Sequence, residues 1–455
     1  MTKDIKELVQ AQKAWFMSGS TRSLSARIKA LNDLESSIKV HENDLLEALF
    51  KDLHKDRTES FMTELGIIYG EIRHHKKHLA SWMRERRVRT PITLFPSTSR
   101  LMPEPYGCVL IVSPWNYPVQ LCFEPLIGAI SGGNCAVIKP SAYAPAVSSA
   151  VAEVIRDAFP EQFIAVVEGG REENRILFEQ PFDYIFFTGS VAVGKEVMAA
   201  AARNLTPVTL ELGGKSPVII EKSADIRKAA RKVAFGKVLN AGQTCVAPDY
   251  VLIDETIRDS FIEEYRKALK RFSPDGSFRQ MASIVNEKHY ERLRGLMEGH
   301  KPVIGGHYKA SERRIEPSVY TDVTLGDGLM QQEIFGPLLP VLTYKTLDEA
   351  IAFIVKQPHP LALYLFTRDG EIQRKVMDSC QFGGGCVNDV ILHLSSANLP
   401  FGGVGASGMG QYHGKKSFET FTHMRSVLVS PASAEIPIPY MPYSRLKEKL
   451  LRRVM

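Results

Sequence analysis

One thiol in a short glycine-containing segment has the residue type and spacing that nucleophilic catalysis uses. Cys245 closes the hexapeptide that begins at Asn240, and Gly242 lies three residues before the thiol. A cysteine on a turn beside a helix terminus can be both reachable and partly ionised, and the thiolate is the nucleophilic form. The alternative is a structural thiol, because free cysteine is among the most frequently buried residue types. The hexapeptide alone leaves both interpretations open.

An amphipathic run before this segment predicts the element that positions the thiol. Apolar residues recur at helical spacing from Ile226 to Leu239, which indicates a helix buried on one side. Gly242 then ends the helix or bends the chain.

Further upstream, apolar β-branched runs alternate with helical segments, and this alternation predicts a doubly wound parallel sheet of the α/β class. Such sheets bind ligands at the carboxyl ends of their strands. The expected strands are Tyr106 to Val112, Cys135 to Ile138, Phe163 to Val167, Tyr184 to Phe187 and Val208 to Leu210. The expected helices between them are Val119 to Ile130, Pro145 to Phe159, Arg171 to Phe178 and Val191 to Ala202.

Two of the expected strand ends carry residues suited to a dinucleotide. Lys139 follows the second strand, and the segment Thr188 to Gly194 joins the fourth strand to an alanine-rich helix. The backbone N–H groups and the dipole at a helix start suit a pyrophosphate. Gly189 and Gly194 have the spacing Gly-x-x-x-x-Gly, which differs from the ordinary dinucleotide fingerprint and also serves the geometry of a turn.

Beyond Glu211 the chain enters a second α/β region that contains Cys245. Glycine-rich segments at 332–337, 383–388 and 399–410 indicate a loop system within and after it. Loops laid over a rigid scaffold are where binding residues concentrate.

Length and composition argue against several classes of protein. A chain of 455 residues predicts two or three domains, and 44% hydrophobic with 24% charged residues is typical of a globular protein. A net charge of +6, with no Lys/Arg block among aromatics, argues against nucleic acid as a partner. No apolar run reaches the roughly eighteen residues of a spanning helix, so no integral membrane segment is expected. Six cysteines without a CxxC pair, and a charged start without a signal-peptide pattern, predict a cytoplasmic protein with free thiols.

The two ends of the chain and one proline-rich segment lie outside this pattern. Residues 3–85 mix apolar and charged positions at helical spacing, which predicts amphipathic helices. Within them His74, His75 and His78 have no carboxylate or cysteine to complete a ligand set, so we expect a solvated basic face and no metal site. Residues 86–102 have the prolines and alternation of an extended arm. Residues 444–455 predict a basic amphipathic helix, docked or solvated, with contact to an anionic membrane surface as the alternative.

A series of motifs, taken in order, resembles the aldehyde dehydrogenase superfamily from about residue 20 to 430, and the short N-terminus is similar to its class 3 branch. The resemblance implies a Rossmann-like doubly wound cofactor domain (1–85 and 103–208), a second α/β catalytic domain (209–395), a small β oligomerisation arm with bridging elements (86–102 and 396–430) and a C-terminal tail (431–455). The motifs are Pro114 to Pro118, Lys139 to Ser141, Phe187 to Ser190, Leu210 to Lys215, Asn240 to Cys245, Glu333 to Pro337 and Pro400 to Gly403.

The same resemblance implies three catalytic roles. Cys245, as thiolate, attacks the aldehyde carbon and forms a thiohemiacetal, which becomes a thioester when hydride leaves. The Asn116 amide and the Cys245 backbone N–H hold the oxyanion. Glu211 then activates the water that hydrolyses the thioester. Taken alone, Asn116 is equally a turn-forming residue.

The cofactor implied by the resemblance is NAD or NADP. Lys139 is expected at the adenine-side ribose and Glu333 at the nicotinamide ribose, where the alternative for Glu333 is a surface carboxylate. Ala142 stands where many NAD-preferring relatives have a glutamate, so a like-charge penalty is missing and Lys139 remains to pair with a phosphate. NADP is therefore expected to be tolerated alongside NAD. The remaining cofactor residues are expected to be Trp115, Gly189, Ser190, Gly194, Leu212 and Phe335.

Several expectations remain about substrate, assembly and competing functions. The substrate is expected to be a medium-chain aliphatic or aromatic aldehyde, and the kinship predicts a homodimer. One competing hypothesis is a CoA-acylating relative, against which Glu211 argues; another is a nucleotide-binding structural protein, which requires a broken site. The residues expected to border the substrate tunnel are Tyr117, Thr244, Ile391, His393 and Phe401.

Overall fold

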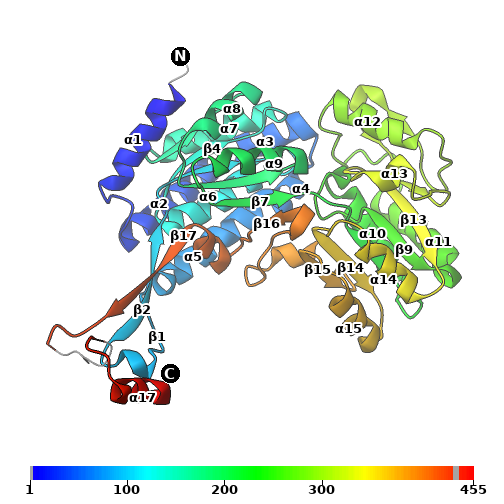
Figure 1. Ribbon diagram of the computed structural model, residues 1–455. Coiled ribbons are helices and arrows are strands. Elements are labelled where there is room, and N and C mark those ends of the chain that lie inside the picture. The colour runs from blue at the N-terminus through cyan, green and yellow to red at the C-terminus, as the bar shows by residue number, and fades with distance from the viewer. Residues whose placement is uncertain (1–3, 434–439, 455) are drawn as a thin grey trace.

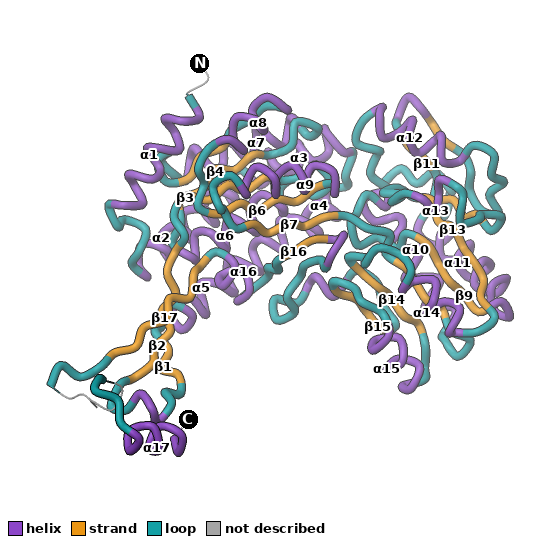
Figure 2. Tube along the Cα trace, in the orientation of Figure 1, coloured by secondary structure: helices purple, strands orange, loops and turns teal. Residues whose placement is uncertain are grey.

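The computed structural model describes residues 4–433 and 440–454, and these form two six-stranded sheets flanked by helices and a projecting three-stranded arm (Figures 1 and 2). The predicted α/β fold built on parallel sheets is confirmed. The first sheet lies in the half of the molecule that carries the arm, and the second sheet lies in the other half (Figure 1).

The first sheet has the strand order β16-β7-β6-β3-β4-β5, and all neighbours in it are parallel except the short edge strand β16. Every expected strand and helix of this region is present, with ends that differ from the expected ones by no more than two residues. The strands are β3 (Cys108–Val112), β4 (Cys135–Lys139), β5 (Ile164–Val166), β6 (Tyr184–Gly189), β7 (Val208–Leu212) and β16 (Gly408–Met409). The helices are α6 (Gln120–Gly132), α7 (Pro145–Ala158), α8 (Arg171–Glu179) and α9 (Val191–Ala202).

The second sheet has the order β12-β13-β9-β8-β14-β15 and is parallel throughout. A small antiparallel pair, β10 (Tyr308–Lys309) and β11 (Arg314–Ile315), lies apart from it. The strands of this sheet are β8 (Pro217–Ile220), β9 (Tyr250–Asp254), β12 (Ser318–Tyr320), β13 (Leu338–Tyr344), β14 (Ala362–Phe366) and β15 (Gly384–Val387). The helices of this half are α10 (Ile226–Val238), α11 (Arg258–Phe272), α12 (Glu287–Met297), α13 (Gly328–Gln331), α14 (Leu347–Val355) and α15 (Gly370–Ser379).

The N-terminal region is helical, as its amphipathic spacing predicts, and α2 and α3 pack against α7 of the first sheet. The prediction of a solvated basic face is wrong for His75, which is fully buried and bonds Ser131 and Glu71. The reason is that α5 packs against α6, so one of its faces belongs to the core. These elements are α1 (Ile5–Met17), α2 (Leu24–Val40), α3 (Glu42–Leu53), α4 (Arg57–Ser60), the π-helical η1 (Phe61–Leu65) and α5 (Gly66–Trp82).

The arm consists of β1 (Arg86–Val88), β2 (Thr98–Pro105) and β17 (Thr422–Val429), with β2 in the middle and antiparallel to both neighbours. Helix α16 (Lys415–Thr420), which precedes β17, packs on α6 and ties the arm to the first half. The predicted basic helix is α17 (Arg445–Val454), which is largely exposed and lies beside the arm (Figure 1). Residues 434–439 and 455 of the expected tail lie outside the described residues. Among the residues described, no helix is long and apolar enough to cross a membrane.

Candidate active site

The segment that carries the thiol follows the predicted helix directly, and the chain bends at Gly242 as the sequence predicts. Helix α10 ends at Val238, and Asn240, Ala241 and Gly242 follow with positive φ values of 49°, 53° and 70°. Gly242 is needed here because a Cβ at this position would collide with the carbonyl oxygen of Gly336. The turn therefore forms against the Gly336 loop, and a helix end alone would not produce it.

Gln243 anchors this turn from inside. Its side-chain amide donates to the carbonyl oxygens of Asn240 and Ser283, each at 3.0 Å, and its Oε1 accepts from the Val285 N–H at 3.0 Å. Gln243 is fully buried, so all three bonds lie away from solvent. The backbone beside Cys245 is thus fixed before any ligand arrives.

Two cavities meet at Cys245. One of about 270 Å³ has Asn116, Glu211 and Glu333 on its wall, and the other, of about 110 Å³, is mainly apolar. Both have Cys245 on their walls, together with Leu121, Phe401 and Tyr412. The thiol is therefore open to two separate spaces, of which the larger carries charged side chains on its wall and the smaller is lined by uncharged residues and His413.

Glu211 lies on β7, paired with Thr188 of β6 and Gly408 of β16. Both of its carboxylate oxygens are buried, and neither has a hydrogen-bond partner among the described residues. Burial without compensation raises the pKa of Glu211 well above its ordinary value. The carboxylate form of Glu211 is therefore a stronger base than a solvated glutamate.

The thiol itself is in surroundings that oppose its ionisation. Burial, followed by the nearby Glu333 and Glu211 carboxylates, raises the pKa of Cys245 to about 12, although the N–H groups of Cys245 and Val246 act in the opposite direction. The expectation of a partly ionised thiol rests on a helix terminus beside the cysteine, and these surroundings give it no support. The turn with positive φ values separates Cys245 from the end of α10.

Glu333 lies on the wall of the larger cavity, where its position is fixed by bonds to residues of the second α/β half. Its Oε1 accepts from the Gly214 N–H at 3.1 Å, and burial together with Asp249 raises the pKa of Glu333 to about 8. Asp249 forms an ion pair with Lys215 and accepts from the Ile334 N–H at 2.9 Å. This pairing fixes the loop that carries Glu333.

The other expected cofactor residues surround the same cavity or the start of α9. The Ser190 hydroxyl caps α9 by accepting from the Val193 N–H at 3.4 Å, and Gly194 lies against Leu212 where a Cβ would be only 2.6 Å from a methyl group. Trp115 and Phe335 meet edge to face, with ring centroids 5.3 Å apart. A helix start capped by Ser190, beside a cavity with a buried carboxylate, fits a dinucleotide.

Lys139 is the last residue of β4, and its side chain lies among backbone carbonyl groups. Its ammonium donates to the carbonyl oxygens of Pro140 at 2.8 Å and Gly169 at 2.7 Å, and only 2% of the residue is exposed. Burial lowers the pKa of Lys139 from its ordinary value. Ala142, three residues later, is exposed and leaves this edge without a carboxylate.

Four of the five residues expected around the substrate line the smaller cavity: Tyr117, Thr244, Ile391 and Phe401. His393 is not among the lining residues. Its ring stacks against Phe401 with centroids 6.0 Å apart, and its Nδ1 lies 3.6 Å from the Cys386 sulfur. His393 therefore supports the wall from behind Phe401.

Some residues at the site had no recognisable signal in the sequence. Arg292 of α12 lines the larger cavity and donates to the Ile334 carbonyl oxygen at 2.6 Å, and His289 of the same helix packs on Trp115 with ring centroids 5.1 Å apart. Tyr412 lines both cavities and is 1% exposed. Tyr412 follows the glycine-rich segment 399–410, which is the one sequence signal near these three residues. Helix α12, which carries Arg292 and His289, contains no recognisable motif.

Comparison with known proteins shows which family this chain resembles over its whole length. The model described as "Aldehyde dehydrogenase family" matches residues 1–427. The chain is 48% identical over 448 residues to the 4,4'-diaponeurosporen-aldehyde dehydrogenase of Staphylococcus aureus (strain NCTC 8325 / PS 47), with 96% of each chain covered. It is 44% identical to the "Aldehyde dehydrogenase, dimeric NADP-preferring" of Canis lupus familiaris, in an alignment that covers 94% of this chain and 95% of the canine chain.

Two further similarities concern the branch and the fold. The chain is 42% identical to "Aldehyde dehydrogenase family 3 member B1" of Rattus norvegicus, over 98% of this chain and 96% of that one. A solved structure of Staphylococcus aureus AldH in a substrate-bound state superposes with a TM-score of 0.97 at 46% identity, covering 99% of both chains. The class 3 resemblance and the fold that it implied are confirmed.

Proposed function

The chain belongs to the aldehyde dehydrogenase family and is an oxidoreductase that oxidises aldehydes with NAD or NADP. From this premise we propose that Cys245, Asn116 and Glu211 carry out the reaction and that water accepts the acyl group. The observation that supports the proposal most strongly is the position of Cys245 on the walls of both cavities, with Asn116 and Glu211 on the larger one.

In the first step, the Cys245 thiolate attacks the aldehyde carbon. A bond forms between sulfur and carbon while the carbonyl π electrons move to oxygen, which becomes an oxyanion. The Asn116 amide and the Cys245 backbone N–H stabilise this charge. A donor set of this kind contributes about 2.7 to 4 kcal/mol for each donor. Asn116 is 3% exposed and its Nδ2 donates to the Gln243 carbonyl oxygen at 3.1 Å, so its amide already faces the nucleophile loop.

The bound nicotinamide supplies the acceptor for the hydride that leaves the thiohemiacetal carbon. Glu333 would hold the nicotinamide ribose, the start of α9 at Ser190 would hold the pyrophosphate, and Trp115 with Phe335 would pack along the cleft. Lys139 would lie near the adenine-side ribose.

Glu211 then acts on the thioester that remains on Cys245. Its carboxylate takes a proton from water as the water oxygen attacks the acyl carbon; the carbon–sulfur bond breaks and a carboxylic acid leaves. The raised pKa of Glu211 keeps the group basic enough for this transfer. We therefore favour hydrolysis over transfer to CoA.

An activity assay without CoA tests the proposal. Purified protein mixed with an aldehyde and NAD or NADP is expected to form reduced cofactor, and absence of the product without CoA would favour the CoA-acylating alternative. Cys245→Ala is expected to abolish turnover while the dissociation constant for NADP changes by less than about threefold, because the thiol makes no contact needed to seat the dinucleotide. Retained turnover in this variant would show that another residue is the nucleophile.

The substrate that best fits the smaller cavity is a medium-chain aliphatic or aromatic aldehyde. Most of the wall is formed by apolar and aromatic side chains such as Leu121, Phe401 and Tyr412, with Gln120 and His413 among the few polar ones. The name of the staphylococcal relative contains the name of an aldehyde, 4,4'-diaponeurosporen-aldehyde, which agrees with an aldehyde as the substrate. We also propose that the protein acts in the cytoplasm as a homodimer; the word "dimeric" in the name of the canine relative supports the second part.

A further inference from the structure

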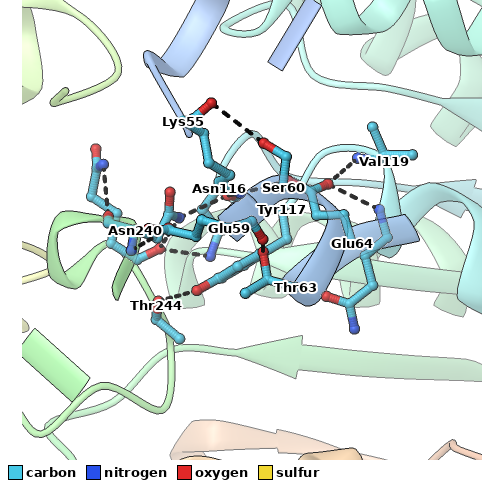
Figure 3. A network of polar contacts seen from close by, with 12 residues as sticks. Lys55, Glu59, Ser60, Thr63, Glu64, Asn116, Tyr117, Val119, Asn240 and Thr244 are labelled. Atoms are coloured by element: carbon cyan, nitrogen blue, oxygen red, sulfur yellow. Dashed lines mark hydrogen bonds and ion pairs between the residues drawn. The ribbon is translucent and has the colours of Figure 1, made fainter. Parts of the chain in front are cut away.

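A fully buried ion pair lies directly behind the loop that carries Asn116 (Figure 3). The Lys55 ammonium donates to Glu64 Oε1 at 2.5 Å and to the Asn116 carbonyl oxygen at 3.2 Å, and neither charged side chain is exposed. Glu64 Oε2 accepts from the N–H groups of Val119 at 2.8 Å and Gln120 at 3.2 Å. The pair therefore holds the backbone on both sides of Tyr117.

The same carbonyl oxygen also joins this loop to the nucleophile loop. Asn240 Nδ2 donates to the Asn116 carbonyl oxygen at 2.8 Å and to the Gln243 carbonyl oxygen at 3.1 Å. Glu59 Oε1 in turn accepts from the Asn240 N–H at 2.7 Å, which holds the backbone of a residue in the left-handed region with a φ of 49°. Asn116 and the Cys245 turn are thus fixed relative to each other by one set of buried bonds.

A third connection runs through Tyr117. The Lys55 ammonium lies 4.3 Å from the centre of the Tyr117 ring, a distance at which a desolvated cation and an aromatic face attract. The Tyr117 hydroxyl shares a hydrogen bond of 2.6 Å with the Thr244 hydroxyl. Thr244 precedes Cys245, so Lys55 also reaches the nucleophile through this ring.

The local fold explains how one short segment reaches both loops. Residues 61–65 form a π-helical turn between α4 and α5, and hydrogen bonds in such a turn join residues five apart. Glu59 and Glu64 are also five apart, and Figure 3 shows Glu59 next to Asn240 and Glu64 next to Val119. A regular α-helix would turn these two carboxylates further from each other around its axis.

We propose that Lys55 and Glu64 are positioning residues that hold the Asn116 amide against the Cys245 turn, with Glu59 acting on the turn through Asn240. The inference rests on the proposed role of Asn116 at the oxyanion. A displacement of this amide weakens a contact made in the transition state, so kcat/KM for the aldehyde falls while binding of the cofactor does not change.

A double-mutant cycle between Lys55→Met and Asn116→Ala tests the inference. Lys55→Met is expected to lower kcat/KM about 30-fold in the otherwise native chain, a smaller loss than the roughly 10²- to 10³-fold cost of removing one oxyanion donor. In the Asn116→Ala background the same change is expected to cost less than about threefold, because the group that Lys55 positions is absent. Equal losses in both backgrounds, or no loss in the native one, would overturn the inference.

The cycle separates this inference from the proposed function. If Asn116→Ala itself retains activity, the proposed role of Asn116 fails, and the positioning inference fails with it. If Asn116→Ala is impaired and Lys55→Met acts equally in both backgrounds, the positioning inference alone fails. KM for NADP is measured for every variant, and an increase of more than about fivefold in Lys55→Met would overturn the inference by assigning Lys55 a general structural role.

Because Lys55→Met leaves the Glu64 carboxylate buried without a cation, that variant is expected to be less stable. The double variant Lys55→Met/Glu64→Gln removes both charges and keeps acceptors for the Val119 and Gln120 N–H groups. Its thermal midpoint is expected to recover toward the native value while kcat/KM stays low; recovery of kcat/KM as well would overturn the inference. The matched control is Lys76→Met, which breaks a partly exposed ion pair in the same helical region, between Lys76 Nζ and Glu35 Oε2 at 2.9 Å. This variant is expected to keep native activity.

Discussion

The environment of Cys245 sets the conditions under which it can act. Its pKa is raised to about 12 by burial and then by the carboxylates of Glu333 and Glu211. A thiol with a raised pKa is mostly protonated at neutral pH, so the fraction of thiolate grows about tenfold for each pH unit until the pKa is reached. Of these two carboxylates, Glu333 is proposed to bind the nicotinamide ribose and Glu211 to activate water.

The pH dependence of thiol alkylation tests this electrostatic arrangement. In the protein without cofactor, the iodoacetamide reaction of Cys245 is expected to keep accelerating above pH 9.0, the ordinary thiol value. Glu333→Gln removes a negative neighbour, so the inflection is expected to move to lower pH and the rate at about pH 8 to rise several-fold. Cys245→Ala serves as the blank for the other five cysteines. An unchanged profile in Glu333→Gln would contradict the account.

At the scale of single residues, the sequence predicts which side chains take part in the chemistry better than it predicts their protonation. Cys245, Glu211 and Asn116 were predicted together and line one cavity. The raised thiol pKa cannot be read from the sequence, because it depends first on burial and then on Glu333, which lies far along the chain from the thiol. His393 was expected on the cavity wall, and its place behind Phe401 depends on how the loop turns at Ile391, whose φ is 65°.

At the scale of elements, the edge around Lys139 bears on the choice of cofactor. Lys139 donates hydrogen bonds to two backbone carbonyls, which hold its charge near the end of β4. Ala142 provides no carboxylate to repel a 2′-phosphate. The expected tolerance of NADP therefore depends more on the missing repulsion than on a new contact from the lysine.

Ala142→Glu tests this point. The new carboxylate is expected to lower kcat/KM for NADP by at least about tenfold through like-charge repulsion, while kcat/KM for NAD stays within about threefold. Ala142→Gln has similar size without charge and is the control, with both cofactors used as in the native protein. The expectation is contradicted if the native enzyme discriminates against NADP by more than about a thousandfold, or if Ala142→Glu leaves the NADP value unchanged.

The elements themselves were largely predictable, and the exceptions have physical reasons. The buried strands of the first sheet read as continuous apolar runs, because both faces of a parallel sheet are covered. The end of α10 is predicted to within one residue, but the turn after it is not, because three consecutive residues adopt positive φ and two of them, Asn240 and Ala241, are not glycine. Tertiary bonds from Glu59 and Gln243 stabilise this turn, and such bonds between distant segments leave no local signature.

At the scale of the whole molecule, the arm presents apolar side chains that nothing covers within the described chain. Ile92 is 72% exposed and Phe95 is 63% exposed, both in the segment between β1 and β2. Exposed apolar groups of this size on a projecting element are typical of a surface that meets a partner. We infer that this segment contributes to the proposed homodimer.

Light scattering at micromolar concentration tests the assembly. The native protein is expected to have the mass of two chains, about twice 50.8 kDa. Ile92→Asp/Phe95→Asp places two charges on the exposed segment and is expected to shift the mass toward one chain, with little change in the far-ultraviolet circular dichroism. Leu205→Asp, a change at a residue 90% exposed and outside the arm, is the control. A native monomer would contradict the inference.

The central claim is that the acyl group passes through a covalent bond to Cys245, and the most direct measurement is peptide mapping by mass spectrometry. Glu211→Gln protein is mixed with a medium-chain aldehyde and NADP, quenched in acid and digested. Because the amide that replaces the carboxylate cannot activate water, an acyl group is expected on the peptide that contains Cys245, with close to one reduced cofactor formed per chain. Reduced cofactor that accumulates without an acyl group on that peptide, or with the group on another cysteine such as Cys386, would contradict the account.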